Sequence, residues 1–310
     1  MRLDDYDPGD DIRDLGRGGG GGGFNLGGGG GGGIGGLLIG LLPMLLGRKL
    51  GCGTILLIGA VVVGFMMFSG GGMQLAGGGA GSSAGPLAAG NVACDTAGER
   101  FACNVFGSTH QVWEAVFQQN GQRYTRPTLN FFTEQNQSGC GAAQSAMGPF
   151  YCPADQGVYL DTSFFTELER QLGAGGDAAQ AYVVAHEVGH HIQTISGTSD
   201  QVRNAQRRAS EAEGNELQVR MELQADCYAG VWASQARTAD GGRAIEPGDF
   251  EEAMRAAQSI GDDTLMQNAG QRPVPESFTH GTSAQRQSWL RRGIESGDPR
   301  QCDTFGAAAL

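Results

Sequence analysis

Basic side chains are scarce in this sequence. The 310 residues include 33 Asp and Glu but only 21 Lys and Arg, for a formal net charge of -12, and Lys49 is the one lysine. Without a cluster of basic residues, a nucleic-acid partner is not expected. The chain also lacks a Cys-x-x-Cys pair, which argues against a metal site built from closely spaced cysteines.

Glycine, in contrast, is abundant near the N-terminus. Residues 1–33 are acidic and then almost pure glycine, a composition that cannot bury enough apolar surface to offset the chain entropy. No strand-like run precedes these glycines, and no Gly-Lys-Ser or Gly-Lys-Thr closes them, which argues against a phosphate-binding loop. We therefore expect residues 1–33 to form a disordered leader.

An apolar region at residues 34–69 follows the leader. Its first part is short and interrupted by glycine and proline, whereas its second part contains the uncharged run LGCGTILLIGAVVVGFMMF. This run is close to the length needed to cross about 30 Å of hydrocarbon. We expect a single transmembrane helix at about 50–69, a flexible Gly/Ala/Ser linker at 70–93 and one folded domain at 94–310.

The distribution of basic residues indicates an orientation for this helix. Arg48 and Lys49 directly precede it, while the stretch just after it carries no basic residue. The positive-inside rule then predicts a single-pass protein of the cell membrane, with a cytoplasmic N-terminus and an extracytoplasmic domain. A cleaved signal peptide is less consistent with the long glycine-rich leader.

The cysteines fit an oxidising environment. One of the seven, Cys52, lies in the apolar run, and the others belong to the C-terminal domain. An even set in an extracytoplasmic domain favours disulfides, although sequence alone leaves many pairings open. By proximity along the chain we favour Cys94–Cys103 and Cys140–Cys152, leaving Cys227 with Cys302.

The domain is expected to be α+β and mostly helical, with a small β-sheet. Two runs rich in apolar and aromatic residues, Thr128–Thr133 and Gly157–Asp161, predict short strands. Helices are expected from a cap at Thr109 and over Asp161–Leu172. Everything after Gly197 has helical character, with expected helices at about 200–212, 215–236, 248–260 and 282–294.

The segment Ala181–His191 carries His-Glu-x-x-His in helical surroundings, with Asp177 as a plausible N-cap. His186 and His190 are four residues apart, so a helix places both imidazoles on one face, one turn apart. Two imidazoles in this arrangement form half of a tetrahedral zinc site. Glu187 lies beside this face, placed to take a proton from a water that the metal activates.

A catalytic zinc needs a third protein ligand and one open position. Glu222 and Asp226 lie one turn apart beside an apolar packing face, and we expect Glu222 to be the third ligand. Asp226 is expected to accept a hydrogen bond from the second ring nitrogen of His186 or His190. The alternative is that both carboxylates are solvated. Other candidate ligands are Glu211, Glu213 and Glu216.

Two further histidines need an interpretation. His191 lies off the metal face and is expected to be a packed or solvated histidine. His280 precedes the last predicted helix. Peptide hydrolysis passes through an oxyanion, which His280 or Arg286 could stabilise, and a structural loop histidine is the alternative.

Several segments together resemble a known family, the neutral zinc metallopeptidases, which are membrane-anchored bacterial proteins with a glycine-rich leader. Glu-x-x-x-Asp after His-Glu-x-x-His is similar to the pattern of gluzincins such as thermolysin, although the interval between His190 and Glu222 is longer here. In the segment around His280, Gly281 stands where membrane-associated gluzincins have proline. The segments that carry the resemblance are HEVGHH (186–191), MELQAD (221–226), GPFYCPAD (148–155), VYLDTSFF (158–165) and THGTSAQR (279–286).

The resemblance implies a zincin-like fold with Zn²⁺ as the cofactor. His186, His190 and Glu222 would be the zinc ligands, Glu187 the general base and Asp226 the partner of a ligand histidine. By the same resemblance, a peptide substrate is expected to add a strand to the small sheet, at Thr128–Thr133.

We therefore expect a membrane-anchored zinc metalloendopeptidase that acts on a peptide or protein, with His280 as a further catalytic candidate. One alternative is a non-catalytic envelope-binding module that zinc stabilises, which requires a fourth protein ligand. Another is a zinc hydrolase of a different bond, such as an amide in cell-wall material.

Overall fold

A computed structural model describes residues 1–3, 11–17, 93–308 and 310. Apart from Ala269–Gln271, which are assigned to a second unit, they belong to one compact unit that comprises Met1–Gly19, Ala89–Asn268 and Arg272–Leu310. The predicted transmembrane helix lies outside the described residues. Within the described part of the chain, no helix is both long and apolar enough to span a bilayer.

The main sheet has four strands in the order β1-β2-β6-β5. At its centre, β2 (Thr128–Thr133) runs parallel to β6 (Gly157–Leu160), and most residues of both strands are buried. Such double-sided burial explains why both read as short apolar runs rather than alternating patterns. Both strands confirm the sequence prediction. At one edge, β5 (Phe150–Cys152) pairs antiparallel with β6.

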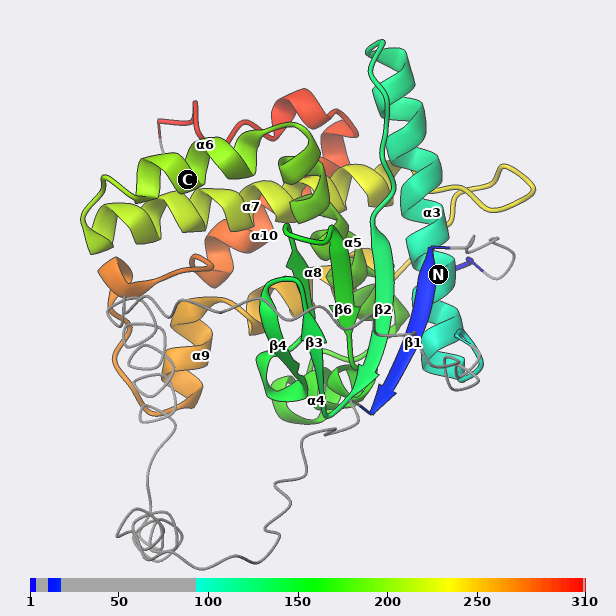
Figure 1. The fold of residues 1–310 in the computed structure, drawn as a ribbon, viewed down its shortest axis with the longest axis horizontal. Coiled ribbons are helices and arrows are strands. Elements are labelled where there is room, and N and C mark those ends of the chain that lie inside the picture. The colour runs from blue at the N-terminus through cyan, green and yellow to red at the C-terminus, as the bar shows by residue number, and fades with distance from the viewer. Residues whose placement is uncertain (4–10, 18–92, 309) are drawn as a thin grey trace, which may run out of the picture. The chain divides into compact units, whose positions relative to one another are not determined.

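The strand at the other edge, β1 (Ile12–Arg17), pairs parallel with β2 and contradicts, at these residues, the disorder expected for the leader 1–33. Residues 18–33 of that leader lie outside the described residues. Figure 1 shows β1 beside β2, although the two are far apart in the sequence. Leu3 is buried in the same core, with 2% of its surface exposed. The prediction failed because the glycine-rich composition hid a short strand, which is stabilised by backbone pairing with β2 rather than by local pattern.

A second, two-stranded sheet is formed by β3 (Gln135–Ser138) and β4 (Gly141–Gln144), which pair antiparallel. The 3₁₀ turn η2 (Ser145–Met147) then leads towards β5. The sequence analysis did not predict β3, β4 or β5, because these polar or very short strands lack a clear alternating pattern.

The first long helix, α3 (Ala97–Gln119), begins well before the expected cap. Thr96 caps it and forms a capping box with Glu99. Thr109 instead lies buried within the helix, where its hydroxyl donates to the carbonyl of Phe106 at 2.6 Å. The capping-box spacing of Thr96 and Glu99 was the signal that the prediction missed.

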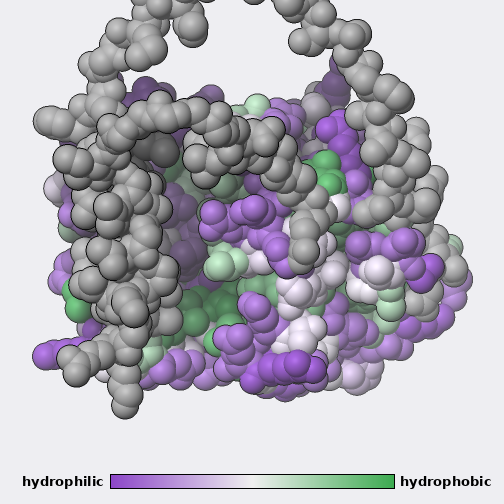
Figure 2. Space-filling view, turned by 60° about the horizontal axis from the view of Figure 1, so that its bottom comes forward, coloured by the Kyte–Doolittle hydropathy of each residue, from purple (hydrophilic) through white to green (hydrophobic). Residues whose placement is uncertain are grey.

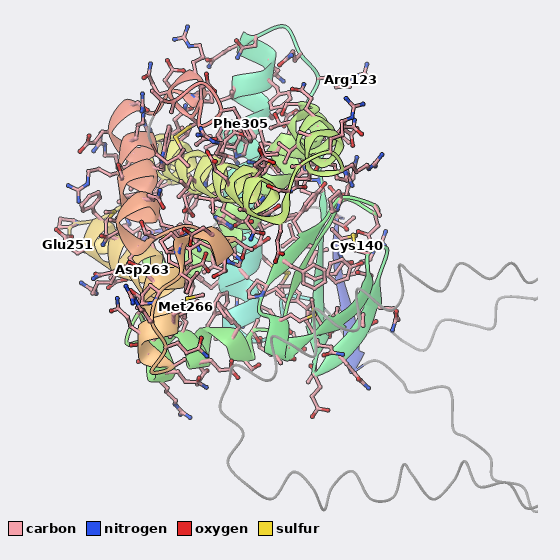
Figure 3. The ribbon with its side chains drawn as sticks, turned by 90° about the vertical axis from the view of Figure 1, so that its left-hand side faces the viewer. Arg123, Cys140, Glu251, Asp263, Met266 and Phe305 are labelled. Carbon is pink, nitrogen blue, oxygen red and sulfur yellow. A yellow bond between two sulfur atoms is a disulfide. The ribbon has the colours of Figure 1, made fainter. Side chains whose placement is uncertain are left out.

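The helices and the strands lie on different sides of the domain. Figure 3 shows the strands with Cys140 on one side and the helices that carry Glu251 and Met266 on the other.

Asp177 begins the helix of the His-Glu-x-x-His motif but is not its cap, which is Gly176. Its carboxylate accepts a hydrogen bond from the α-amino group of Met1 at 2.8 Å. The helices are α4 (Ser163–Leu172), α5 (Asp177–Ile195), α6 (Thr198–Gln206), α7 (Glu211–Gln235), α8 (Asp249–Ser259), α9 (Asp262–Asn268) and α10 (Ser283–Ser296), with 3₁₀ turns η3 (Pro275–Ser277) and η4 (Pro299–Gln301).

Two close helix contacts use glycine. A Cβ on Gly189 of α5 would lie 3.0 Å from the Cα of Ala225 in α7. A Cβ on Gly293 of α10 would lie 2.0 Å from the carbonyl oxygen of Cys227 in α7. Because such distances are shorter than van der Waals contact, glycine lets α5 and α10 approach the backbone of α7. The mixed α+β fold, mostly helical, confirms the predicted class of the domain.

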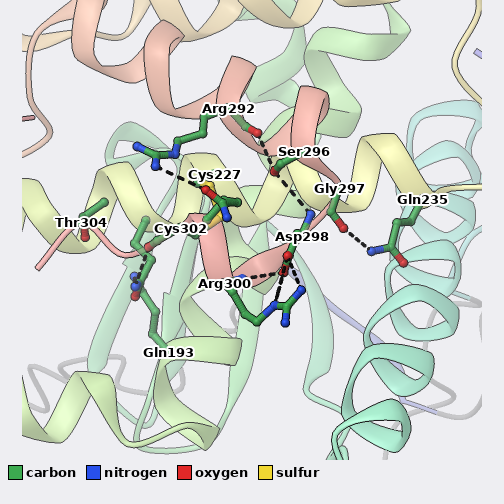
Figure 4. Close-up of a disulfide and its surroundings, with 12 residues drawn as sticks. Gln193, Cys227, Gln235, Arg292, Ser296, Gly297, Asp298, Arg300, Cys302 and Thr304 are labelled. Carbon is green, nitrogen blue, oxygen red and sulfur yellow. Dashed lines mark hydrogen bonds and ion pairs between the residues drawn. A yellow bond between two sulfur atoms is a disulfide. The ribbon is translucent and has the colours of Figure 1, made fainter. Parts of the chain in front are cut away.

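All three predicted disulfides are present. Cys94 pairs with Cys103, Cys140 with Cys152, and Cys227 with Cys302. The last one joins α7 to the C-terminal segment that follows α10, as Figure 4 shows.

Candidate metal centre

Three donor groups from α5 and α7 converge on one point. The Nε2 atom of His186 lies 3.1 Å from Oε2 of Glu222, and Nε2 of His190 lies 3.5 Å from the same oxygen. All three donor atoms are within 4.8 Å of one another. The structure therefore brings together the three residues that the sequence analysis assigned as metal ligands.

The position of Gly189 explains how the two helices come this close. It lies between His186 and His190 on α5, and it faces Ala225, which lies between Glu222 and Asp226 on α7. The small contact at the crossing allows the longer side chains on either side of it to meet. A larger residue at 189 would push α7, and Glu222 with it, away from the histidines.

The second nitrogen of His186 is held by Asp226, with 2.8 Å between Nδ1 and Oδ1. This contact selects His186 from the two ligand histidines that the sequence analysis had left open for Asp226. Asp226 is fully buried and is also bound by Arg286 and by the hydroxyl of Tyr182. A carboxylate at Nδ1 leaves the lone pair on Nε2, the atom that faces Glu222.

The second nitrogen of His190 has a different partner, Gln193. Its Oε1 lies 2.9 Å from Nδ1 of His190, and its side chain is completely buried. The sequence analysis missed this residue. The three-residue spacing on one helix was the available signal, but a glutamine in that position is common without a metal.

The charges of the site favour a cation. Burial alone lowers the pKa of His186, but the charge of Asp226 and hydrogen bonds to Asp226 and Glu222 raise it to about 10. Burial raises the pKa of Glu222, yet the charge of His190 and the hydrogen bond with His186 bring it well below its usual value. The buried carboxylates thus remain ionised and favour positive charge beside them, and a cation that displaced the proton from Nε2 would supply that charge. Two imidazoles and a carboxylate form the donor set of many zinc sites, so these residues fit the metal.

Glu187 lies in the wall of the same site. It is 7% exposed and makes no hydrogen bond with any residue that the structure describes. Both Glu187 and the three donor residues line a cleft of about 570 Å³. Its carboxylate is therefore free to act on a molecule in the cleft.

Apolar residues line much of this cleft. Met147 and Leu265 are 61% and 39% exposed, and they are two of the three exposed large hydrophobic residues found in the described part of the chain. Figure 2 shows a face on which apolar surface gathers in a hollow between hydrophilic residues. Single exposed apolar residues are ordinary, but their concentration at one cleft suits an extended ligand with apolar groups.

His280 also lines the cleft, and half of its side chain is exposed. Its Nδ1 lies 3.3 Å from Oδ1 of Asp262, whose other oxygen accepts the backbone N–H of His280 at 2.7 Å. Burial lowers the pKa of His280, but the hydrogen bond with Asp262 and the charge of Glu222 raise it above its usual value. Asp262 thus fixes a histidine, with a raised pKa, in the loop beside the donor residues.

Arg286 also lines the cleft, but its guanidinium is engaged inside the protein. It is 2% exposed, and its guanidinium binds Asp226 through both Nε and Nη2. Its charge is already used inside the protein. His280, half exposed in the cleft, is therefore the better placed of the two candidates for stabilising an oxyanion.

The other acidic candidates for the third ligand lie elsewhere. Glu213 forms the capping box of α7 with Ser210, and Glu216 pairs with Arg220 at 2.9 Å. Glu211 lies in the first turn of α7. None of the three belongs to the group of converging donors.

Comparison with known proteins identifies the family to which the chain belongs. The family model described as "Putative neutral zinc metallopeptidase" matches residues 1–305. The chain belongs to this family. The family description suggests a hydrolase, and it agrees with zinc as the metal for His186, His190 and Glu222.

Similar proteins occur in Escherichia coli and in Mycobacterium tuberculosis. "Uncharacterized protein YpfJ" of Escherichia coli (strain K12) is 52% identical over 207 residues, which cover 67% of this chain and 71% of the relative. "Uncharacterized protein Rv2575" of Mycobacterium tuberculosis (strain H37Rv) is 46% identical over 216 residues, covering 67% and 72%. No solved structure matches the chain.

In this family member, His191 is a packed residue, one of the two alternatives expected for it. It is fully buried, its Nε2 lies 2.7 Å from the carbonyl of Thr125, and its Nδ1 lies 3.1 Å from the hydroxyl of Tyr151. Burial lowers the pKa of His191 to about 4. Because Tyr151 belongs to β5 and lines the cleft, this neutral histidine ties the edge strand to α5.

Proposed function

We propose that this chain is a zinc-dependent metalloendopeptidase. One observation carries the proposal: Glu187, without a hydrogen-bond partner in the described part of the chain, lies in an open cleft beside the converging donors His186, His190 and Glu222. A structural zinc site has no need of a free carboxylate there. A hydrolytic site needs a base in that position.

Zinc bound by the three donors would polarise the peptide carbonyl and lower the pKa of water towards about 7. Glu187 accepts the proton of the attacking water and delivers it to the leaving amine. His280, oriented by Asp262, donates a hydrogen bond to the oxygen of the attacked carbonyl, where negative charge develops. Asp226 and Gln193 keep the two imidazoles in the tautomer that leaves Nε2 free.

The peptide is proposed to pair with β5 rather than with β2. Because β2 lies between β1 and β6, both of its edges are already paired, and the expectation of strand addition at Thr128–Thr133 is wrong. β5 is the outer strand of the sheet as described, and its residues Phe150 and Tyr151 line the cleft. An extended peptide added at this edge would pass the metal centre.

A non-catalytic envelope-binding module is the alternative, and it would need a closed metal site. Among the described residues, the group around His186 offers three ligands, and the six cysteines are paired in disulfides. His280 is the remaining candidate for a fourth ligand, but it does not belong to the group of donor atoms that lie within 4.8 Å of one another. This arrangement favours an open position and therefore catalysis.

We further propose that the protein is attached to the cell membrane through the apolar region at 34–69. The three disulfides favour an extracytoplasmic location for the folded domain. Since β1 and β2 are hydrogen-bonded neighbours, the strand at residues 12–17 must lie on the same side of the membrane as the domain. A single pass between residues 17 and 94 would put β1 and β2 on opposite sides, so we propose an attachment that returns to the same side in place of the single pass expected from the sequence. We therefore favour an extracytoplasmic N-terminal strand over the cytoplasmic one expected from the basic residues.

The peptidase proposal is tested with a library of extended peptides. The wild-type protein and Glu187→Gln are both loaded with zinc, and the metal content of each is measured first. We expect equal zinc and a loss of cleavage of roughly 10²–10⁴-fold in the variant. Equal cleavage by both proteins would assign the activity to a contaminant or to another site. Zinc binding without cleavage of any peptide would favour the binding module.

A further inference from the structure

We propose that a buried chain of side-chain amides orients His190, and that the Cys227–Cys302 disulfide is part of the support of the metal centre. The inference rests on the proposed zinc site. It concerns how two glutamines and the C-terminal segment prepare one of its ligands.

The chain of hydrogen bonds runs from α5 through α7 to the C-terminal segment. Gln193, which holds Nδ1 of His190, donates from its Nε2 to the carbonyl of Met221 at 2.7 Å and to Oε1 of Gln224 at 3.1 Å. Gln224 donates in turn to the carbonyl oxygen of Cys302 at 3.0 Å. Both glutamine side chains are buried, which is unusual for amides unless their polar atoms are satisfied.

The carbonyl oxygen of Cys302, at the end of this series of hydrogen bonds, fixes which atom donates in each of them. A backbone carbonyl only accepts, so the amide nitrogen of Gln224 must face Cys302, and its oxygen must face Gln193. Gln193 then uses its nitrogen towards Gln224 and Met221, which leaves its oxygen for His190. Because that oxygen only accepts, Nδ1 of His190 must carry the proton, and Nε2 is left free for the metal.

The disulfide holds Cys302, the last residue in this series of hydrogen bonds. Cys227 lies one turn after Gln224 on α7, and its bond to Cys302 crosses a sequence separation of 75 residues. The bond keeps the carbonyl of Cys302 against the helix that carries both Gln224 and the ligand Glu222. A nearby hydrogen bond, from the hydroxyl of Thr304 to the carbonyl of Arg220 at 2.7 Å, also binds this segment to α7. Figure 4 shows Gln193, the disulfide and Thr304 in this region.

The two ligand histidines therefore depend on different kinds of support. His186 is oriented by an ionised carboxylate, Asp226, through one direct contact. His190 is oriented by a neutral amide, whose own orientation depends on the segment after α10. Gln224 is accordingly a positioning residue that acts through Gln193 without touching a ligand. Loss of the disulfide is expected to weaken zinc binding through His190 alone.

The test measures the zinc dissociation constant of the full chain by competition with a chromophoric chelator. Gln224→Met fills the same space but breaks the chain of amides, and Cys227→Ser with Cys302→Ser removes its anchor. We expect each to weaken zinc binding about tenfold. Combined, they should weaken it little more than either alone, because they act on one network. Cys94→Ser with Cys103→Ser removes a disulfide that has no part in the chain, and it should leave the constant unchanged.

A folded Gln224→Met variant with the zinc affinity of the wild type overturns the proposal. Failure of the wild type itself to bind zinc would instead overturn the proposed function, so the two failures are distinguishable. If Gln224→Met does not fold, ¹⁵N NMR of the histidines in the zinc-free wild type, at a pH at which His190 is neutral, decides the question. A proton on Nδ1 of His190 supports the amide chain, and a proton on Nε2 contradicts it.

Discussion

Arg286 binds Asp226 with two hydrogen bonds, each 2.9 Å long, and both side chains are buried. The hydroxyl of Tyr182 donates to the same carboxylate at 2.6 Å. Although burial raises the pKa of Asp226, Arg286 and His186 lower it to about 2. Asp226 can therefore remain ionised behind His186 because Arg286 neutralises its charge. A carboxylate left without this partner would be costly in the interior.

Replacement of Arg286 should accordingly destabilise the fold. Arg286→Met leaves Asp226 buried with one fewer counter-charge, and we expect a loss of about 3–5 kcal/mol in the free energy of unfolding. Urea denaturation of zinc-free protein measures it. Arg126→Met is the matched control, because Arg126 forms an exposed pair with Glu114 at 3.5 Å. That pair should contribute about 0–1 kcal/mol. Similar losses in both variants would show that the buried pair contributes no more to stability than the exposed pair.

Removal of the third ligand should empty the metal site. Purified wild-type protein is expected to contain about one zinc per chain, and Glu222→Ala markedly less, because two imidazoles alone hold zinc weakly. Elemental analysis after dialysis measures both. Glu216→Ala serves as the control, since Glu216 lies on the same helix but pairs with Arg220 at the surface. Full zinc content in Glu222→Ala would remove Glu222 from the ligand set.

The residues that sequence could predict are those whose relationship is local. His186 and His190, and likewise Glu222 and Asp226, are separated by one helical turn, so each pair could be placed on one face without knowing the fold. The strand Thr128–Thr133 was also found, because its buried position leaves a continuous apolar run. Pairing of cysteines by proximity succeeded for the same reason.

What sequence could not predict depends on contacts between distant elements. The choice of His186 as the histidine bound by Asp226 follows from how α5 packs on α7 at Gly189. The contact of Arg286 with Asp226 follows from how α10 packs on α7, through glycines such as Gly293. The short strand β1 has no local pattern to reveal it, and it becomes a strand only against β2. The role of Gln193 depends on its hydrogen bond with Gln224, which lies on a different helix.

A buried histidine away from the metal centre should make stability depend on pH. His110 is 2% exposed, and its pKa is lowered to about 3, mainly by burial. Between pH 6.5 and pH 3 the unfolded chain binds a proton at this residue and the folded chain does not, so the free energy of unfolding falls as the pH falls through this window. From pH 7 to pH 5, His110 alone should contribute a loss of about 2 kcal/mol.

The variant His110→Phe tests this contribution, because phenylalanine keeps a ring of similar size and cannot titrate. Urea unfolding of both proteins at pH 7 and pH 5 gives the two differences. The wild type should lose more stability than the variant by about 2 kcal/mol, whatever the carboxylates contribute to both. Equal pH dependence would mean that His110 is protonated or exposed in the folded state.

The position of β1 leads to a prediction about membrane sidedness. A strand cannot hydrogen-bond to β2 across about 30 Å of hydrocarbon, so residues 12–17 and the folded domain must lie on one side. Arg13→Cys and Gln135→Cys each place a thiol at an exposed position, one on β1 and one on β3 of the domain. Both are made with Cys52→Ser, so that the introduced thiol is the one outside the three disulfides.

Spheroplasts that express each variant are treated with a maleimide that does not cross membranes. If the domain is extracytoplasmic, both thiols should react in intact spheroplasts. Labelling of Gln135→Cys alone would place β1 in the cytoplasm and would contradict its pairing with β2 in the membrane-attached protein. If neither reacts until the cells are lysed, the two strands share the cytoplasmic side, and the disulfides would then have to form in a reducing compartment, against expectation. The two variants therefore test separately whether β1 lies on the same side as the domain and on which side of the membrane the domain lies.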